Sequence, residues 1–308
     1  MFFKVEVIFM SIIKKFAEPL GFDERAICEL TACYEKILAA PGALDIIYEA
    51  QELLFLKEGN DFHAALSPIY DKVDASPYEI DMVFLLLSLA PLKYVYRARG
   101  YSDELFYATM RDLLYKLNEC RDVYGISGTF VAHWNQKFFT CERFALGRLQ
   151  FETRAYPIKE PFRDIYKPGD TVIGCHIPSC GPLTEESVLD SLKQAYEFFS
   201  DRLIDGKLYV YCHSWLMYPP YIGTVFSEGS NTYKFAKLFE LIKVEEDEKY
   251  GDYFRVFNRM FKPEELADAP EDTGLRRRLK KFLLDGNKMG EAFGFIEFDG
   301  EKVLTVQK

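Results

Sequence analysis

Two apolar stretches decide the fold of the second half of the chain: "TVIGCHIP" (Thr171–Pro178) and "KLYVYCHSWL" (Lys207–Leu216). Both have the length and composition of buried strands. The segment between them, "TEESVLDSLKQAYEFFSDRL", has the spacing of an amphipathic helix, with Thr184 as its N-cap. A strand, a helix and a second strand in this order predict a βαβ unit, whose strands pair in parallel through a right-handed crossover.

The neighbouring segments extend this unit into a larger sheet. In "LGRLQFETRAY" (Leu146–Tyr156) apolar residues alternate with Arg148, Gln150, Glu152 and Arg154, which predicts a strand with one polar face. Further along the chain we expect a helix from about Asn231 to Ile242, a strand at "DYFRVF" (Asp252–Phe257), a helix from Thr273 to Gly286 and a terminal hairpin, "AFGFIEF-DGE-KVLTV".

The first half of the chain has a different pattern. From about Asp23 to Tyr124 the apolar residues recur with helical spacing, and a helix ending before Pro41-Gly42 is followed by helix starts at Ser76 and Ser102. This pattern predicts an all-helical bundle of about five helices.

The pattern changes at "YGISG" (Tyr124–Gly128), whose glycines indicate a domain boundary. We therefore expect a helical N-terminal domain over residues 1–128 and a mixed α/β domain over residues 129–308. The second domain begins with a short helix, "TFVAHWNQKFF", and contains a central twisted sheet. The predicted fold class is α+β.

Composition excludes some classes of function. A net charge of -10 and a pI near 5.1 argue against nucleic-acid or anionic-membrane binding, because such surfaces are bound through clustered Lys and Arg. The hydrophobic fraction of 49% is typical of a folded globular protein. Seven cysteines, an odd number, without a recognisable secretory signal favour the reducing cytoplasm.

The most apolar segments do not resemble membrane helices. Lys4 and Glu6 interrupt the N-terminal "MFFKVEVIFM", which makes it a poor signal peptide or anchor, and Met10 is an alternative start. The run "MVFLLLSLAPL" (Met82–Leu92) contains Pro91 and is too short to span a bilayer. We expect it to form a buried helix.

On the two predicted parallel strands and in the turn after the first are five residues of types that bind zinc: Cys175, His176, Cys180, Cys212 and His213. Adjacent residues on a strand point to opposite faces, so each Cys-His pair offers only one ligand to a common ion. We therefore expect no metal, and Cys175 and Cys212 to pack in the core. An alternative is a thiol enzyme in which Cys180 is the nucleophile and His176 or His213 the base.

The turn "PSCGPLT" (Pro178–Thr184) supports another hypothesis. It joins the end of a strand to a helix N-cap, so the N–H groups of the first helical turn face the space beyond the strand. Ligands of mixed α/β sheets bind outside the carboxyl ends of parallel strands. The turn is either a site for a pyrophosphate or an ordinary strand-to-helix loop.

Several segments together resemble a known family, the bacterial acyltransferase-domain proteins that join a helical N-terminal domain to a GNAT-like C-terminal domain. The segments are "LGRLQFE" (Leu146–Glu152), "HIPSCGPLTEESV" (His176–Val188), "CHSWLM" (Cys212–Met217), "SNTYKF" (Ser230–Phe235) and "EDTGLRRRL" (Glu271–Leu279). The resemblance implies an acyl-CoA or acetyl-CoA co-substrate held where the two parallel strands separate. The cofactor-binding residues that it implies are Ser179, Cys180, Gly181, Leu183 and Thr184, although "PSCGPLT" departs from the glycine-richer GNAT pattern Q/R-x-x-G-x-G/A.

The resemblance also implies direct transfer of the acyl group to an amine. Tyr233 matches the tyrosine that protonates the leaving thiolate, or it packs its ring on the sheet. His176 is the expected general base and His213 the alternative, unless each is a buried, hydrogen-bonded structural histidine. Gln150 and Glu152, on the polar face of their strand, either line the acceptor side or belong to a solvated sheet face.

The expected partner is a small-molecule or peptide amine, with no nucleic acid and no membrane. Two other hypotheses stay open: a non-catalytic module that binds acyl-CoA or another apolar ligand, and the metal or thiol enzyme.

Overall fold

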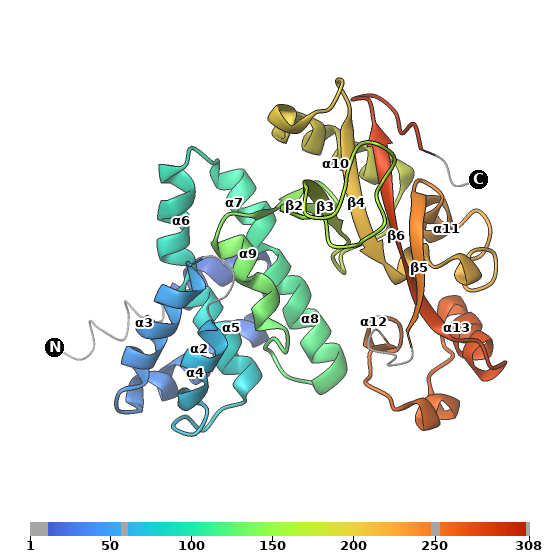
Figure 1. Ribbon diagram of the computed structural model, residues 1–308. Helices are drawn as coiled ribbons and strands as arrows, with labels where there is room; N and C mark the ends of the chain where they lie inside the picture. The colour runs from blue at the N-terminus through green and yellow to red at the C-terminus, as the bar shows by residue number, and fades with distance from the viewer. Residues whose placement is uncertain (1–11, 57–60, 248–252, 306–308) are drawn as a thin grey trace. The chain divides into compact units, whose positions relative to one another are not determined.

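The structure, a computed structural model, describes residues 12–56, 61–247 and 253–305. It divides between Phe144 and Ala145 into two units, a helical one and one built on a sheet (Figure 1). The predicted α+β class is confirmed. The expectations for the N-terminal stretch, including the alternative start at Met10, concern residues outside the described part.

Three helices of the first unit begin where the sequence predicts. Asp23, Ser76 and Ser102 are N-caps whose side chains accept hydrogen bonds from backbone N–H groups of the first helical turn. The described part contains more helices than the five or so expected, because Ser88 and Arg111 each divide one long helical run in two. Residues 12–20 are helical, and the helices that follow are α2 (Glu24–Ala39), α3 (Ala43–Leu54), α4 (Phe62–Leu66), α5 (Pro77–Leu87), α6 (Leu89–Ala98), α7 (Asp103–Met110), α8 (Asp112–Tyr124) and α9 (Gln136–Phe139).

The boundary between the units lies later than the predicted one at Gly128. The N–H of Thr129 donates to the carbonyl of Tyr78 at 3.0 Å, and an added Cβ at Gly128 would lie 2.4 Å from the same carbonyl. The backbone after α8 is thus packed tightly against the start of α5. Residues 129–144 belong to the helical unit for this reason, although the glycines before them suggest a linker.

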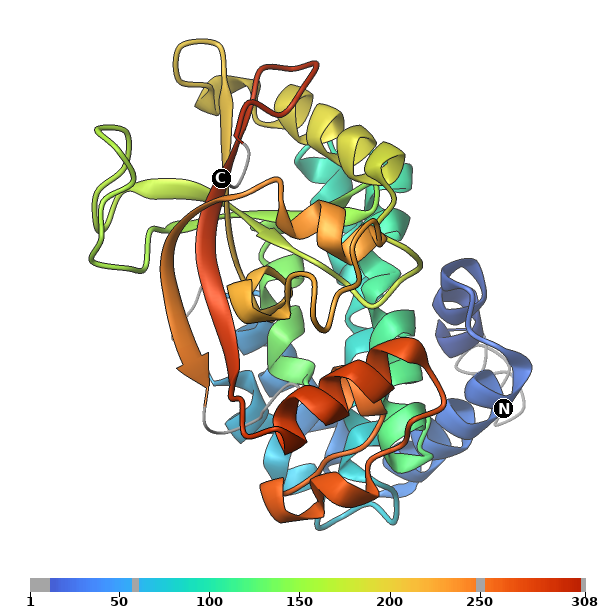
Figure 2. The same cartoon turned by 90° about the vertical axis from the view of Figure 1, so that its right-hand side faces the viewer.

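The second unit contains a six-stranded mixed sheet in the order β1-β2-β3-β4-β6-β5. The parallel pair is β3–β4, whereas β2–β3, β4–β6 and β5–β6 are antiparallel. Figure 2 shows β5 and β6 curving side by side. The strands are β1 (Arg143–Leu146), β2 (Leu149–Ala155), β3 (Thr171–His176), β4 (Leu208–Ser214), β5 (Glu240–Asp247) and β6 (Met289–Phe298).

The predicted βαβ unit is confirmed as β3, α10 (Glu185–Phe198) and β4. The parallel pairing runs from Ile173–Val210 to Cys175–Cys212. Beyond this level β3 ends at His176 and turns into a loop, while β4 continues to Ser214. The two central strands therefore part at their carboxyl ends.

Two predictions for the region after β4 were wrong. The helix expected to reach Ile242 is α11 (Asn231–Ala236), and the chain then forms β5. The segment expected as a strand at "DYFRVF" is the short helix α12 (Tyr253–Phe257). In both places a few apolar residues fit the spacing of a helix as well as that of a strand. For β5, pairing with β6 makes the segment a strand. The predicted helix near the C-terminus is confirmed as α13 (Gly274–Leu284).

The two faces of the sheet differ in character. On one face Tyr209, Tyr211 and Phe295 pack against aromatic residues of the loop between β2 and β3. The opposite face contains the buried Cys175 and Cys212.

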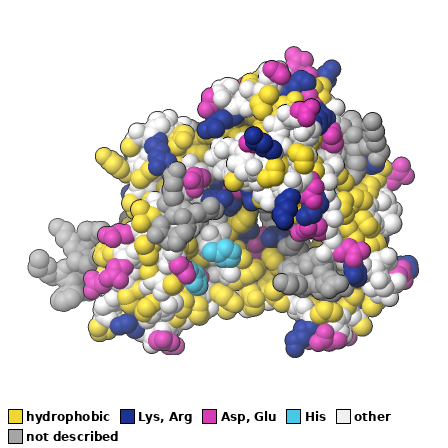
Figure 3. Space-filling model, viewed as in Figure 1, with side chains coloured by type: hydrophobic (Ala, Val, Ile, Leu, Met, Phe, Trp, Pro, Cys, Tyr) yellow, Lys and Arg dark blue, Asp and Glu magenta, His cyan; other side chains and the backbone are white. Residues whose placement is uncertain are grey.

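On the face of the molecule seen in Figure 3, charged side chains of both signs are interspersed. No helix in the described part of the chain combines the length and the apolar character needed to cross a bilayer.

Candidate active site

Strand alternation separates the cysteines from the histidines. Cys175 and Cys212 are register partners on the buried face, and the hydrogen bond between their thiols, together with burial, raises the pKa of Cys175 well above its ordinary value. Both have free thiols. Among the residues that the structure describes, no three His, Cys, Asp or Glu side chains form a metal-binding group.

His176 belongs to a buried polar cluster on the other face. Its Nε2 lies 3.1 Å from Oε1 of Glu152, whose side chain is fully buried, while 18% of the His176 side chain is exposed. Nη1 of Arg154 lies 3.5 Å from the same carboxylate oxygen. The antiparallel register, which pairs Gln150 with His176 and Glu152 with Gly174, brings these side chains together.

Gly174 provides the space for this cluster. An added Cβ there would lie 2.9 Å from Cδ of Arg154 and 3.4 Å from Cγ of Glu152. The side chains of β2 can therefore lie across β3 and reach His176, because the strand has no side chain at this position.

His213 forms a second pair with a carboxylate. Its Nε2 lies 2.7 Å from Oε1 of Glu291, and its ring stacks on Phe293 with centroids 3.9 Å apart. The side chains of His213 and Glu291 are 37% and 32% exposed, so this pair is much more open to water than His176–Glu152. His176 and His213 both follow the last parallel pair of the sheet and lie on the same face. The sequence pattern did not suggest Glu291, because only the pairing of β4 with β6 brings it near.

The loop from Ser179 to Thr184 joins the end of β3 to α10. The hydroxyl of Thr184 accepts a hydrogen bond from the N–H of Ser187 at 3.2 Å, which confirms the predicted N-cap. Gly181 adopts φ 60°, in the left-handed region that favours glycine. Cys180 is partly exposed, and its N–H donates to the carbonyl of Pro178 at 2.8 Å. The side chain of Leu183 is buried.

The charges around this loop are mixed. Glu185 and Glu186 occupy the first turn of α10, and Glu185 pairs with Lys234 of α11 at 3.2 Å. Arg148, from the turn between β1 and β2, donates three hydrogen bonds to backbone carbonyls of the loop region. From the sequence, Arg148 was expected only on the polar face of a strand, because its long-range contacts are not encoded in local spacing.

Tyr233 lies in the first turn of α11. Its N–H donates to the N-cap Ser230 at 3.2 Å, and its partly buried ring packs against an apolar cluster that includes Tyr218, Tyr221 and Leu279. The ring is thus held by packing.

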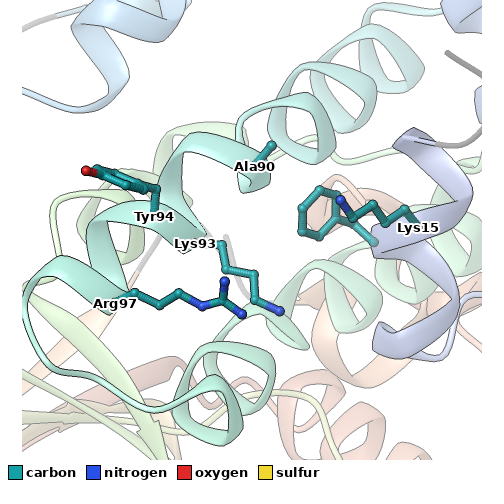
Figure 4. A pocket seen from close by; sticks show the side chains of 6 residues that line it. Lys15, Ala90, Lys93, Tyr94 and Arg97 are labelled. Atoms are coloured by element: carbon teal, nitrogen blue, oxygen red, sulfur yellow. The ribbon is translucent and has the colours of Figure 1, made fainter. Parts of the chain in front are cut away.

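A shallow pocket lies on the helical unit. Figure 4 shows Lys93 and Arg97 side by side on α6, with Lys15 opposite them. Hydrogen bonds from Arg97 and Lys93 lower the pKa of Asp103 to about 2. A second hollow lies beside α10 and is lined by residues that include Thr184 and Ser187. None of the predicted catalytic residues lines either pocket.

A helical unit followed along the chain by a mixed sheet, whose two parallel strands part beside a loop and a capped helix, is the architecture expected of the two-domain acyltransferases. Residues 12–141 match the family model of the N-acyltransferase N-terminal domain, and residues 144–296 match that of the GNAT-like C-terminal domain. The chain belongs to the acyltransferases built from these two domains, and the resemblance described above is confirmed.

Solved structures with the same fold include acyltransferases. One, in complex with decanoyl-CoA and teicoplanin, is 20% identical, with a TM-score of 0.71 over 92% of this chain and 87% of that one. Another, in complex with decanoyl-CoA, is 21% identical, with a TM-score of 0.65 over 93% of this chain and 99% of that one. No curated protein matches the sequence.

Proposed function

We propose that this protein transfers an acyl group from an acyl-CoA to an amine acceptor and that His176 is the general base. The observation that carries the proposal is the pair His176–Glu152, in which Nε2 of a partly exposed imidazole lies 3.1 Å from a fully buried carboxylate where β3 and β4 part. A buried carboxylate orients an imidazole and stabilises its charged form, as a general base requires. The more exposed His213–Glu291 pair is the alternative base.

The donor is an acyl-CoA, which includes acetyl-CoA. The loop that holds its pyrophosphate next to the N-terminus of α10 contains Ser179, Cys180, Gly181, Leu183 and Thr184. The N–H of Cys180 donates to the carbonyl of Pro178 within the loop, so the donors to phosphate are the N–H groups of the other four residues. Acyltransferases of the same fold have been solved with decanoyl-CoA and with CoA, which supports this assignment. We propose no metal for this transfer.

In the reaction, the acceptor nitrogen attacks the thioester carbonyl, so that a C–N bond forms and the C–S bond breaks. His176 takes the proton that the amine loses, and the hydroxyl of Tyr233 donates a proton to the leaving thiolate. The position of Tyr233 in the first turn of α11, the helix after β4, supports its role. Its packing in an apolar cluster would hold the hydroxyl in one orientation.

The acceptor is a small-molecule or peptide amine. A structural relative has been solved with the glycopeptide teicoplanin, and this supports an acceptor of that general kind. The net charge of -10 argues against a nucleic-acid or membrane partner. We place the protein in the cytoplasm, because its cysteines are free thiols and that compartment keeps thiols reduced.

The test has two stages. In the first, thermal unfolding is measured with acetyl-, octanoyl- and decanoyl-CoA, and a ligand at about 100 times its Kd should stabilise the protein by about 2.7 kcal/mol. In the second, release of the CoA thiol is followed with a panel of amines, and acylated products are identified by mass spectrometry. Absence of stabilisation by every thioester would overturn the proposal. Stabilisation without turnover of any amine would favour the non-catalytic binding module.

A further inference from the structure

Arg148, at the turn between β1 and β2, binds the backbone of the loop that follows β3. Its guanidinium donates hydrogen bonds to the carbonyl oxygens of Pro178 at 3.0 Å, Gly181 at 2.9 Å and Pro182 at 3.3 Å. These residues lie 30, 33 and 34 positions further along the chain. A single side chain thus connects the start of the sheet to most of the loop, and its planar fork of five donors suits this geometry.

These bonds set the direction of the N–H groups in the loop. In a trans peptide unit the C=O and N–H bonds point in opposite directions. The carbonyls of Pro178 and Pro182 share their peptide units with the N–H groups of Ser179 and Leu183, and these units are trans. Both N–H groups therefore point away from the guanidinium. Donors arranged in this way beside a helix N-terminus suit phosphate oxygens.

Arg148 also supplies positive charge where the helix N-terminus is offset by acids. Glu185 and Glu186 in the first turn of α10 are exposed, and they oppose the positive end of the helix dipole. Lys234 is paired with Glu185. Arg148, in contrast, donates its three hydrogen bonds in this loop to neutral carbonyls.

The position of Arg148 is itself fixed by α10. The N–H groups of Arg148 and Leu149 donate to the hydroxyl of Ser191 at 2.7 and 3.2 Å, and Ser191 is fully buried. Gly147 adopts φ 68°, and an added Cβ there would lie 2.7 Å from the same hydroxyl. The turn is therefore packed against the helix whose N-terminus the loop precedes.

We propose that Arg148 is the positioning residue of the coenzyme A loop, holding the carbonyls of Pro178, Gly181 and Pro182 so that the opposite side of the loop receives the pyrophosphate. This inference rests on the proposed function. It predicts that replacing Arg148 weakens binding of the donor's phosphates and leaves the chemistry at the thioester unchanged.

The test compares two donors with the same acyl group: an acyl-CoA, and an acyl-N-acetylcysteamine, which is a thioester without phosphates. In Arg148→Ala we expect KM for the acyl-CoA to rise about tenfold or more, with kcat within about threefold of wild type. KM for the truncated thioester should stay within about twofold. Arg148→Lys keeps the charge but not the fork, so its KM for the acyl-CoA should rise by an intermediate factor.

Arg277→Ala is the matched control, because Nη1 of Arg277 donates to the carbonyl of Glu271 at 2.8 Å in another part of the unit. It should leave both KM values unchanged. If Arg148→Ala does not fold, as judged by circular dichroism, the comparison rests on Arg148→Lys. Equal rises in KM for both donors, or none for the acyl-CoA, would overturn the inference while the proposed function stands. Failure of the wild-type protein to bind any acyl-CoA would instead overturn the proposed function and this inference with it.

Discussion

Replacing Glu152 with glutamine tests the candidate base directly. The substitution keeps the size of the side chain and removes a charge that is fully buried between Nε2 of His176 at 3.1 Å and Nη1 of Arg154 at 3.5 Å. A hydrogen bond to a charged group stabilises by about 1.5–3 kcal/mol and a neutral one by about 0.5–1.5 kcal/mol. The loss of about 1–1.5 kcal/mol in holding the imidazole corresponds to a decrease in kcat of about tenfold.

The matched control is Glu291→Gln, which makes the same change beside His213. The side chains of His213 and Glu291 are 37% and 32% exposed, and exposed ion pairs contribute about 0–1 kcal/mol. We therefore expect Glu291→Gln to change kcat by less than about threefold. KM for the acyl-CoA should stay within about twofold of wild type in both variants, since neither residue lies in the loop after β3.

The assay is release of the CoA thiol with an amine that wild type acylates, under saturating acyl-CoA. Urea unfolding of each variant shows that the measured protein is folded, and Glu152→Gln should lower the free energy of unfolding by about 1–3 kcal/mol. Wild-type kcat in Glu152→Gln together with a tenfold loss in Glu291→Gln would refute the reasoning and would identify His213 as the base.

Three further predictions concern packing and charge. Iodoacetamide should label the exposed Cys28 and spare Cys175 in the folded protein, because burial and a raised pKa keep the latter a thiol; equal labelling rates by mass spectrometry would contradict this. Gly174→Ala should lower the free energy of urea unfolding by about 1–3 kcal/mol, because its Cβ would lie 2.9 Å from a side-chain carbon of β2; an unchanged value would show that β2 adjusts freely. The hydrogen bond from Arg121 lowers the pKa of Asp23 to about 2, so Asp23 stabilises the fold fully above the unfolded pKa near 3.8 and less as the pH falls towards 2. Asp23→Asn should therefore cost about 0.5–1 kcal/mol at pH 7, reduced by solvent screening, and about nothing at pH 2; a cost independent of pH would contradict the ion pair.

Local patterns predicted the parts of the site that lie on one element. Alternation along β3 and β4 was enough to separate Cys175 from His176 and Cys212 from His213, because the direction of a side chain on a strand depends only on its position. The turn and the N-cap at Thr184 could also be predicted from local sequence, because capping involves residues only three positions apart.

The contacts between elements were not predictable in this way. Glu152 was expected only to line the acceptor side, because the register that pairs Gln150 with His176 joins residues 26 positions apart. The contacts of Arg148 with the loop join residues that are even further apart in the sequence. The misassigned β5 has the same cause, since its pairing with β6 outweighs the helical spacing of its apolar residues.

The most direct test of the central claim is a crystal structure of the protein with a thioether analogue of an acyl-CoA, which cannot transfer its acyl group. We expect the pyrophosphate oxygens within hydrogen-bond distance of backbone N–H groups in Ser179–Thr184, and the acyl carbon near His176 where β3 and β4 part. A nucleotide bound elsewhere on the protein, with the loop making no contact to phosphate, would contradict the proposed site.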